Sequence, residues 1–337
     1  MLRGAYRRTA AVLGSPWVRV GGTIAGVGVL IHTVDIPKAA ASLGQAEPRW
    51  IAAALGLTAV AVVASVMEWG VLVRTLAPAA APASLSLFSW RRLGSQYLES
   101  LFFTQVLPAG VGGDAVRTVE MGKHVGHTRV LASLAGSRMA GMLGMTVWGL
   151  VAAVLLRQLL GNGIIAAIAV MVGVVVLIWT GALTADRLAP HRLVARVSGA
   201  MGRAMHSFTE AFASYRSHPH AVAQCLIFGA GGWGINIFAL ELGARAIGVD
   251  VSWMVLAVCI PLGLLAALVP FSINGLGVRE GVLVAFLTQM GVSTTQATSV
   301  SLMVDLQMIP FAIIGGLLLL RRSRVRTPRP EPSPQLA

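Results

Sequence analysis

The residues of this sequence that are best suited to chemistry are ionisable side chains set within or beside apolar segments. A charge at the centre of a bilayer costs at least about 2.5–3.5 kcal/mol per residue, so such side chains usually face a cavity and pair with one another. A guanidinium group stays charged and can grip two phosphate oxygens at once, which makes arginine a suitable ligand for phosphate. The residues that we single out are Asp114, Arg117, Arg138, Arg279, Glu280 and Asp305.

The three arginines are expected to contact an anionic ligand directly. We expect Asp114 and Glu280 to hold the arginines in place, and Asp305 could pair with Arg138 across the interior. A purely structural interpretation remains open. In it, Arg117 extends to the cytoplasmic surface, and Arg279 with Glu280 anchors the start of a helix.

Two apolar runs are broken by proline and glycine close to these charges. They cover 107–113 (LPAGVGG) and 269–277 (VPFSINGLG), and an arginine follows the proline at the same spacing in both. Opposed broken helices in two halves indicate an inverted-repeat transporter with a site near the bilayer midplane, although proline and glycine are also common in ordinary membrane helices. The helix-breaking positions are Pro108, Gly110, Gly112, Gly113, Pro270, Gly275 and Gly277, and Asn274 is a further candidate ligand.

The elements that must position these residues are membrane helices. The chain has 337 residues, of which 56% are hydrophobic and 12% charged, and its mean hydropathy is +0.77. Six segments are long enough to cross a bilayer: 17–34, 50–73, 130–156, 163–184, 219–246 and 297–320. We predict an all-α polytopic protein with about six full spans and two oppositely inserted re-entrant hairpins, or eight helices if both hairpins span. A signal peptide is the alternative to an uncleaved first helix.

The distribution of arginine predicts the topology. The net charge of +13 could suggest nucleic acid, but the arginines lie in short segments that flank the apolar spans, so no nucleic-acid partner is expected. We predict cytoplasmic termini, with 1–16 as the N-terminus and 321–337 as a disordered tail. A single domain, 17–320, then has halves 17–184 and 219–320 joined by a basic linker, 185–218, which could lie on the membrane as an amphipathic helix.

The sequence lacks the signatures of an energy-coupled or hydrolytic enzyme. It contains no GxxxxGK[ST], HExxH or GxSxG motif, so we expect neither ATP-driven transport nor an enzyme, and no cofactor or metal. Cys225 and Cys259 lie in apolar segments and should behave as small hydrophobic residues without a disulfide. Trp50, Trp69 and Trp253 lie near predicted span ends and are typical of interfacial belts.

The broken segment 107–117, the segment 133–138 and the run GLGVRE at 275–280 resemble the flippase-like transmembrane domain of lysylphosphatidylglycerol synthases. The resemblance covers roughly residues 15 to 320 and implies a stand-alone member without the soluble aminoacyl-transferase domain. It implies a multi-pass protein of the bacterial inner membrane that translocates an anionic phospholipid or a polyprenyl-phosphate-linked lipid.

This chain departs from the family pattern at two places. Ser137 stands where the family usually has an acidic residue, and Asp305 stands near a position that is often basic. These departures favour a headgroup other than lysyl-phosphatidylglycerol. A lipid-modifying enzyme or a glycosyltransferase is a candidate partner. The alternative function is a non-transporting scaffold or lipid-binding subunit that presents lipid to such an enzyme.

Overall fold

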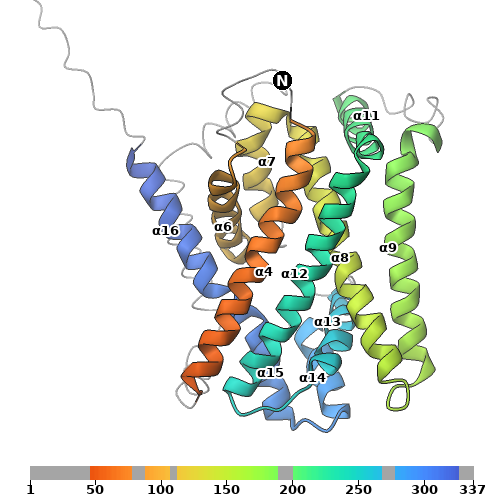
Figure 1. The fold of residues 1–337 in the computed structure, drawn as a ribbon, viewed down its shortest axis with the longest axis vertical. Helices are drawn as coiled ribbons and strands as arrows, with labels where there is room; N and C mark the ends of the chain where they lie inside the picture. Colours follow the sequence, from red (N-terminus) through yellow and green to blue (C-terminus); the bar gives the residue numbers. More distant parts are fainter. Residues whose placement is uncertain (1–45, 78–87, 107–111, 189–199, 268–277, 326–337) are drawn as a thin grey trace, which may run out of the picture.

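A computed structural model describes residues 46–77, 88–106, 112–188, 200–267 and 278–325, and the regular elements of this part are helices (Figure 1). The helices are α4 (Pro48–Thr75), α6 (Trp90–Val106), α7 (Gly112–Val125), α8 (His127–Leu155), α9 (Asn162–Leu188), α11 (Ala200–Ala213), the short 3-10 helix η1 (Ser214–Ser217), α12 (Pro219–Ala246), α13 (Trp253–Ala267), α14 (Val278–Gln289), α15 (Thr294–Leu306) and α16 (Ile309–Val325).

Within the described residues, five helical segments are long and apolar enough to cross a membrane. They are α4, α8, α9 as far as Thr184, α12, and α15 together with α16 over Thr294–Arg322. These segments coincide with five of the six predicted spans, and the prediction of an all-α polytopic membrane protein is confirmed. The predicted span 17–34 lies outside the described residues.

The centre of the bundle is a block of three helices, α4, α8 and α12, packed through small residues (Figure 1). A Cβ at Gly144 of α8 would lie only 2.6 Å from the Cα of Ala230 on α12, so glycine is needed for this approach. The indole of Trp148 donates a hydrogen bond to the carbonyl of Ala230 at 2.8 Å. Backbones that touch in this way form a rigid unit, because no flexible side chains separate them.

Two pairs of shorter helices pack against this block. Figure 1 shows α6 and α7 in the upper half of the view and α13 and α14 in the lower half. Gly112 and Gly113 begin α7, and a Cβ at Gly113 would lie 2.5 Å from the carbonyl oxygen of Ser100 on α6. The glycine therefore permits the close packing of this pair. Outside the described residues lie Pro108, Gly110, Pro270, Asn274, Gly275 and Gly277.

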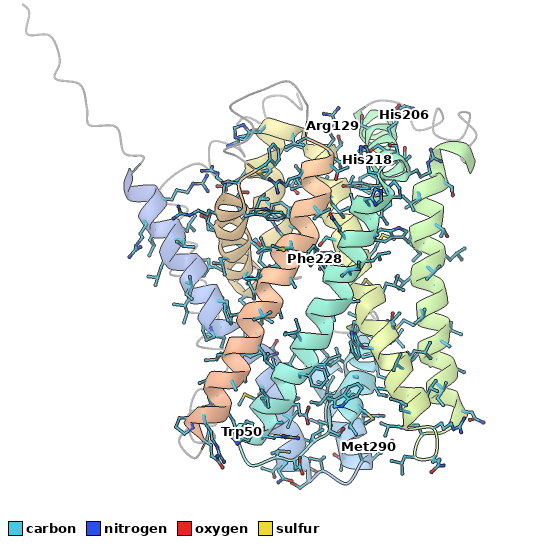
Figure 2. All side chains as sticks on the ribbon, viewed as in Figure 1. Trp50, Arg129, His206, His218, Phe228 and Met290 are labelled. Carbon is cyan, nitrogen blue, oxygen red and sulfur yellow. The ribbon has the colours of Figure 1, made fainter. Side chains whose placement is uncertain are left out.

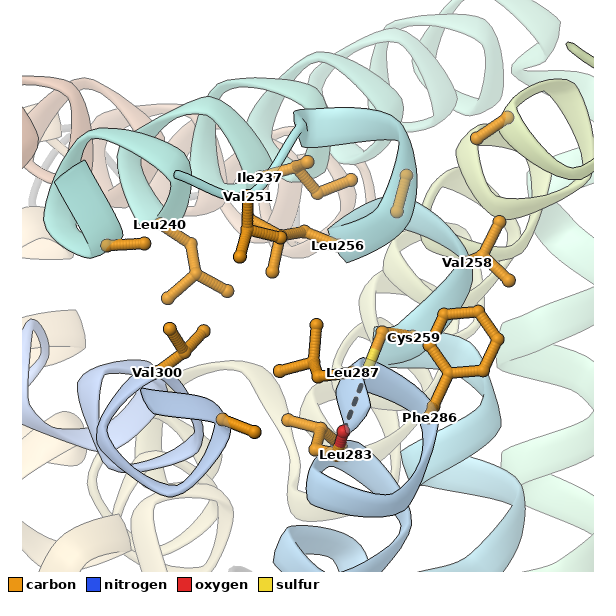
Figure 3. Packing of buried hydrophobic residues seen from close by; sticks show 14 of the residues in the cluster. Ile237, Leu240, Val251, Leu256, Val258, Cys259, Leu283, Phe286, Leu287 and Val300 are labelled. Carbon is orange, nitrogen blue, oxygen red and sulfur yellow. Dashed lines mark hydrogen bonds between the residues drawn. The ribbon is translucent and has the colours of Figure 1, made fainter. Parts of the chain in front are cut away.

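An apolar core joins the lower helix pair to α12 and α15 (Figure 3). Leu240 of α12, Leu256 of α13, Leu287 of α14 and Val300 of α15 are almost fully buried in it. The thiol of Cys259 lies in the same cluster, 3.8 Å from the carbonyl oxygen of Leu283. Cys225 and Cys259 are both buried and free, which confirms their prediction as small hydrophobic residues.

The predicted linker and tail are more integrated into the bundle than the sequence indicated. In the linker, α11 packs against α8 and α9, with Phe212 at 1% exposure and its ring against that of Trp179. The hydroxyl of Tyr215, in η1, donates a hydrogen bond to the carbonyl of Leu72 at 3.2 Å. The predicted tail boundary at 321 is wrong, because α16 continues to Val325. Ion pairs at Arg322, described below, hold this last turn in place.

Candidate functional site

One aspartate joins two of the candidate arginines at the start of α7. Asp114 lies in the first turn of this helix, where an acidic side chain is favoured by the helix dipole. Its Oδ1 accepts from Arg117 at 2.8 Å and its Oδ2 accepts from Nε of Arg138, on α8, at 2.5 Å. The side chains of Asp114 and Arg117 are 16% and 12% exposed, whereas that of Arg138 is 56% exposed. Arg138 is thus the accessible member of the group.

Arg117 is held inside the protein between two aromatic rings. Its Cζ lies 5.0 Å from the ring centroid of Trp69 on α4 and 5.0 Å from that of Tyr97 on α6. Cation–π contacts are strongest where water is excluded, as it is here. The indole of Trp69 is fully buried and donates to the hydroxyl of Ser133 at 3.2 Å. The assignment of Trp69 to an interfacial belt is therefore wrong, and Arg117 does not extend to the surface.

A pocket of about 650 Å³ adjoins Asp114 and Arg138. Its described lining is Asp114, Ala115, Thr118 and Val119 of α7, Leu131, Leu134, Ala135 and Arg138 of α8, and Phe208 of α11. Apart from the ion pair and the Thr118 hydroxyl, these walls are apolar. Such a pocket can hold an anionic group against Arg138 and an apolar chain along the walls.

The second half of the chain forms a separate ion pair. Nη2 of Arg279, in the first turn of α14, lies 2.6 Å from Oδ2 of Asp305 on α15. Asp305 is therefore the partner of Arg279, and its expected pairing with Arg138 is wrong, because Arg138 bonds to Asp114. Glu280 follows Arg279 in α14, but its side chain lies outside the described ones. None of these residues belongs to the described lining of the pocket.

Glu68, which was not among the predicted site residues, lies within α4 and is 6% exposed. Its carboxyl interacts with the Ser137 hydroxyl and the Gly141 backbone on α8 and with the positive charge of Arg117. The signal was available, because an acidic residue inside the predicted span 50–73 is rare and marks a functional candidate.

A second missed cluster ties the end of α16 to α6 and α7. Nη1 of Arg322 lies 3.2 Å from Glu99 on α6 and 2.9 Å from Glu120 on α7. Glu99 is 2% exposed. Below this contact, a Cβ at Gly315 would overlap the carbonyl of Leu98, so α16 and α6 also meet without intervening side chains. The upper helix pair is thus fastened to the last helix by charge and by close packing.

Residues 16–316 match the family of the lysylphosphatidylglycerol synthase TM region. The chain belongs to this family. Membership confirms the resemblance inferred from the broken segments and places the chain among membrane domains linked to phospholipids. No curated protein and no solved structure matches the chain.

Proposed function

We propose that this protein is a lipid translocase that moves an anionic phospholipid or a polyprenyl-phosphate-linked lipid across the bacterial inner membrane without ATP. The observation that carries the proposal is the pocket in which Arg138, at 56% exposure, lies beside apolar walls. A lipid complements such a pocket, because its anionic phosphate can bind the arginine and its apolar chains can lie along the walls. The protein would act as a carrier and not as an enzyme.

The roles of the charged residues follow from their exposure. A phosphate oxygen can reach the Arg138 guanidinium, with which it would form a charge-assisted hydrogen bond. Arg117 does not belong to the described lining of the pocket; it is bonded to Asp114, which it holds in place, and it adds positive potential to the pocket. The Arg279–Asp305 pair would form a second binding site for the headgroup, in the other half of the chain.

The short helix pairs are proposed to be re-entrant hairpins inserted from opposite sides, as an inverted repeat that rocks or gates around a central site. Two observations support this arrangement. The pairs occupy opposite halves of the view in Figure 1, and the end of the molecule near Arg129, His206 and His218 lies opposite the end near Trp50 and Met290 (Figure 2). The first end would face the cytoplasm, together with both termini.

Cysteine labelling tests the hairpins. A cysteine replacing Ala109, in the first break, should resist an impermeant thiol reagent applied from outside, because a re-entrant turn stops within the membrane. Asp250→Cys should react from outside and Lys123→Cys should not, since both positions are exposed at opposite ends. The native cysteines are buried and should give little background. Strong labelling at 109 would favour the eight-helix alternative.

A leaflet-exchange assay tests the translocase itself. Purified protein would be placed in liposomes with fluorescent phosphatidylglycerol, and an impermeant quencher would report the accessible fraction. We expect lipid in both leaflets to become accessible, and Arg138→Gln to slow this exchange. Arg129→Gln is the matched control, because Arg129 lies on the same helix, is exposed and does not line the pocket. A scaffold would bind the lipid without changing its leaflet distribution.

A further inference from the structure

Glu68 is an acidic side chain buried among helices that cross the membrane. It lies in α4, which packs against α8, α12 and α6, and only 6% of the residue is exposed. Its Oε1 has no hydrogen-bond partner, and no described residue forms an ion pair with it. An ionised carboxylate that is buried with one oxygen unsatisfied and no ion-pair partner among the described residues is disfavoured, so this carboxyl must bind a proton or gain a compensating charge.

Glu68 interacts with titratable and charged groups of the surrounding helices. Among the described residues, these include Tyr97 of α6, Arg117 of α7 and Cys225 of α12. From α8, Glu68 meets the Ser137 hydroxyl and the Gly141 backbone, neither of which is charged. Arg117 supplies positive charge to Glu68, but this arginine is already bonded to Asp114.

Glu68 is connected to the lipid pocket through this arginine. Ser137 immediately precedes Arg138, and Asp114 bridges Arg138 to Arg117. Nε of Arg117 is, like Oε1 of Glu68, a buried polar atom without a hydrogen-bond partner among the described residues. The region near Glu68 thus holds an unsatisfied donor and an unsatisfied acceptor, one step behind the residues that line the pocket.

The charge balance decides how Glu68 responds to a bound anion. Among the described residues, the network of Asp114, Arg117 and Arg138 contains two arginines and one aspartate, which gives these three side chains a net charge of +1. A phosphodiester with one negative charge neutralises this net charge only if Glu68 is protonated, whereas an ionised Glu68 would leave the occupied site negative. Because a low-dielectric site favours zero net charge, binding of the anion and binding of the proton support each other.

We propose that Glu68 is the proton-binding site that couples movement of the anionic lipid to a proton. The carboxylate takes up one proton from the side on which the headgroup enters the pocket and releases it on the other side, so one proton travels with one anionic headgroup. This inference rests on the proposed translocase function and assigns its energy coupling. Glu68 acts through the charge of the site and does not touch the phosphate.

The pH dependence of exchange tests the proposal. In the liposome assay with phosphatidylglycerol, whose phosphodiester does not titrate near neutral pH, the parent should work faster as pH falls, by at most about tenfold per pH unit for one proton. Glu68→Gln should exchange lipid at a rate that no longer depends on pH, because the amide imitates the protonated acid. Glu241→Gln is the matched control, since Glu241 is also buried on a spanning helix but pairs with Arg245 instead.

Proton uptake provides a readout that needs neither transport nor a variant. Short-chain phosphatidylglycerol would be added to the parent in detergent and weak buffer with an indicator dye, and we expect about one proton to be taken up per lipid bound. Lipid binding by the parent without proton uptake would overturn the proposal. So would exchange by the parent that is independent of pH, or a Glu68→Gln variant that keeps the parent's pH dependence.

The two proposals fail in distinguishable ways. If the parent exchanges lipid without any response to pH, the coupling role of Glu68 is wrong and the translocase stands. If the parent binds lipid with proton uptake but never exchanges it, the translocase and its energy coupling are wrong, and what stands is a linkage between proton binding and lipid binding. If the parent neither binds nor exchanges phosphatidylglycerol, both are overturned.

Discussion

The two halves of the chain each place an arginine next to an aspartate, but they pack these pairs very differently. Arg117 is 12% exposed, lies between two aromatic rings and shares its aspartate with a second arginine. Arg279 and Asp305 are 31% and 37% exposed. The same spacing of proline and arginine in sequence therefore leads to an enclosed network in one half and a half-open ion pair in the other.

The difference suggests a division of roles. An enclosed network held by two ion pairs and two cation–π contacts keeps its geometry, so the first half is suited to hold Arg138 in a fixed position. A half-exposed pair is weak and can exchange partners at little cost, so the second half is suited to an interaction that forms and breaks during a transport cycle. Substitutions in the two halves should separate these roles.

The largest effect should come from Asp114→Ala. This change leaves Arg117 and Arg138 without their shared carboxylate, and removing one member of a buried ion pair costs about 3–5 kcal/mol. We expect a clear loss of thermal stability in detergent together with loss of lipid exchange. Asp305→Ala is the matched change in the other half and should cost less than about 1 kcal/mol. Equal losses at the two positions would remove the contrast between the halves.

The next effect in size concerns transport and not folding. Arg138→Gln should slow lipid exchange about tenfold, since a charge-assisted hydrogen bond contributes ~1.5–3 kcal/mol. The thermal midpoint should stay close to that of the parent, because the side chain is 56% exposed. Arg138→Lys should recover only part of the rate, because lysine keeps the charge but lacks the planar fork. Full activity of the glutamine variant would place the phosphate elsewhere.

A smaller decrease in transport is expected in the second half. Arg279→Gln should slow exchange several-fold, by about 1 kcal/mol in the barrier, while stability changes by less than that amount. The measurement is the exchange rate in liposomes next to the unfolding temperature of the same preparation. If Arg279→Gln lowers the thermal stability as much as Asp114→Ala is expected to do, the pair is a structural ion pair and not a second binding site.

The smallest effect should come from reversing the second pair. The double variant Arg279→Asp with Asp305→Arg keeps both charges next to each other in a half-exposed site, so its unfolding free energy should lie within about 0.5 kcal/mol of the parent. Each single reversal places two like charges together and should be less stable than the double variant. A double variant no better than the singles would show that these side chains are held by more than their mutual charge.

The sequence predicted the elements better than the partners. Long apolar runs identify spans directly, and the five described ones fall where hydropathy indicated. The partner of an aspartate depends instead on how each helix is rotated and packed, which is why Asp305 was matched with Arg138 although it bonds to Arg279. Burial of Trp69 was missed for the same reason, because position near a span end does not say which face of the helix it occupies.

Long-range ion pairs explain the remaining errors. Arg322 looked like part of a basic tail, and only its contacts with Glu99 and Glu120 show that it belongs to the bundle. Those residues are separated from Arg322 by about two hundred positions in sequence, so no local pattern could relate them. Glu68 differs, because its place inside an apolar run was a local signal that an inventory of charges within every span would have found.

The contact of Gly144 with Ala230 has a mechanical consequence. The contact holds α8 and α12 together as one rigid unit, so in the proposed carrier the pocket would widen by movement of its other walls, α7 and α11. Arg138 lies on this rigid unit and Asp114 lies on α7, so such a movement would stretch the ion pair between them. A phosphate that takes the place of Asp114 at Arg138 would compensate for the broken ion pair and stabilise the open form of the pocket.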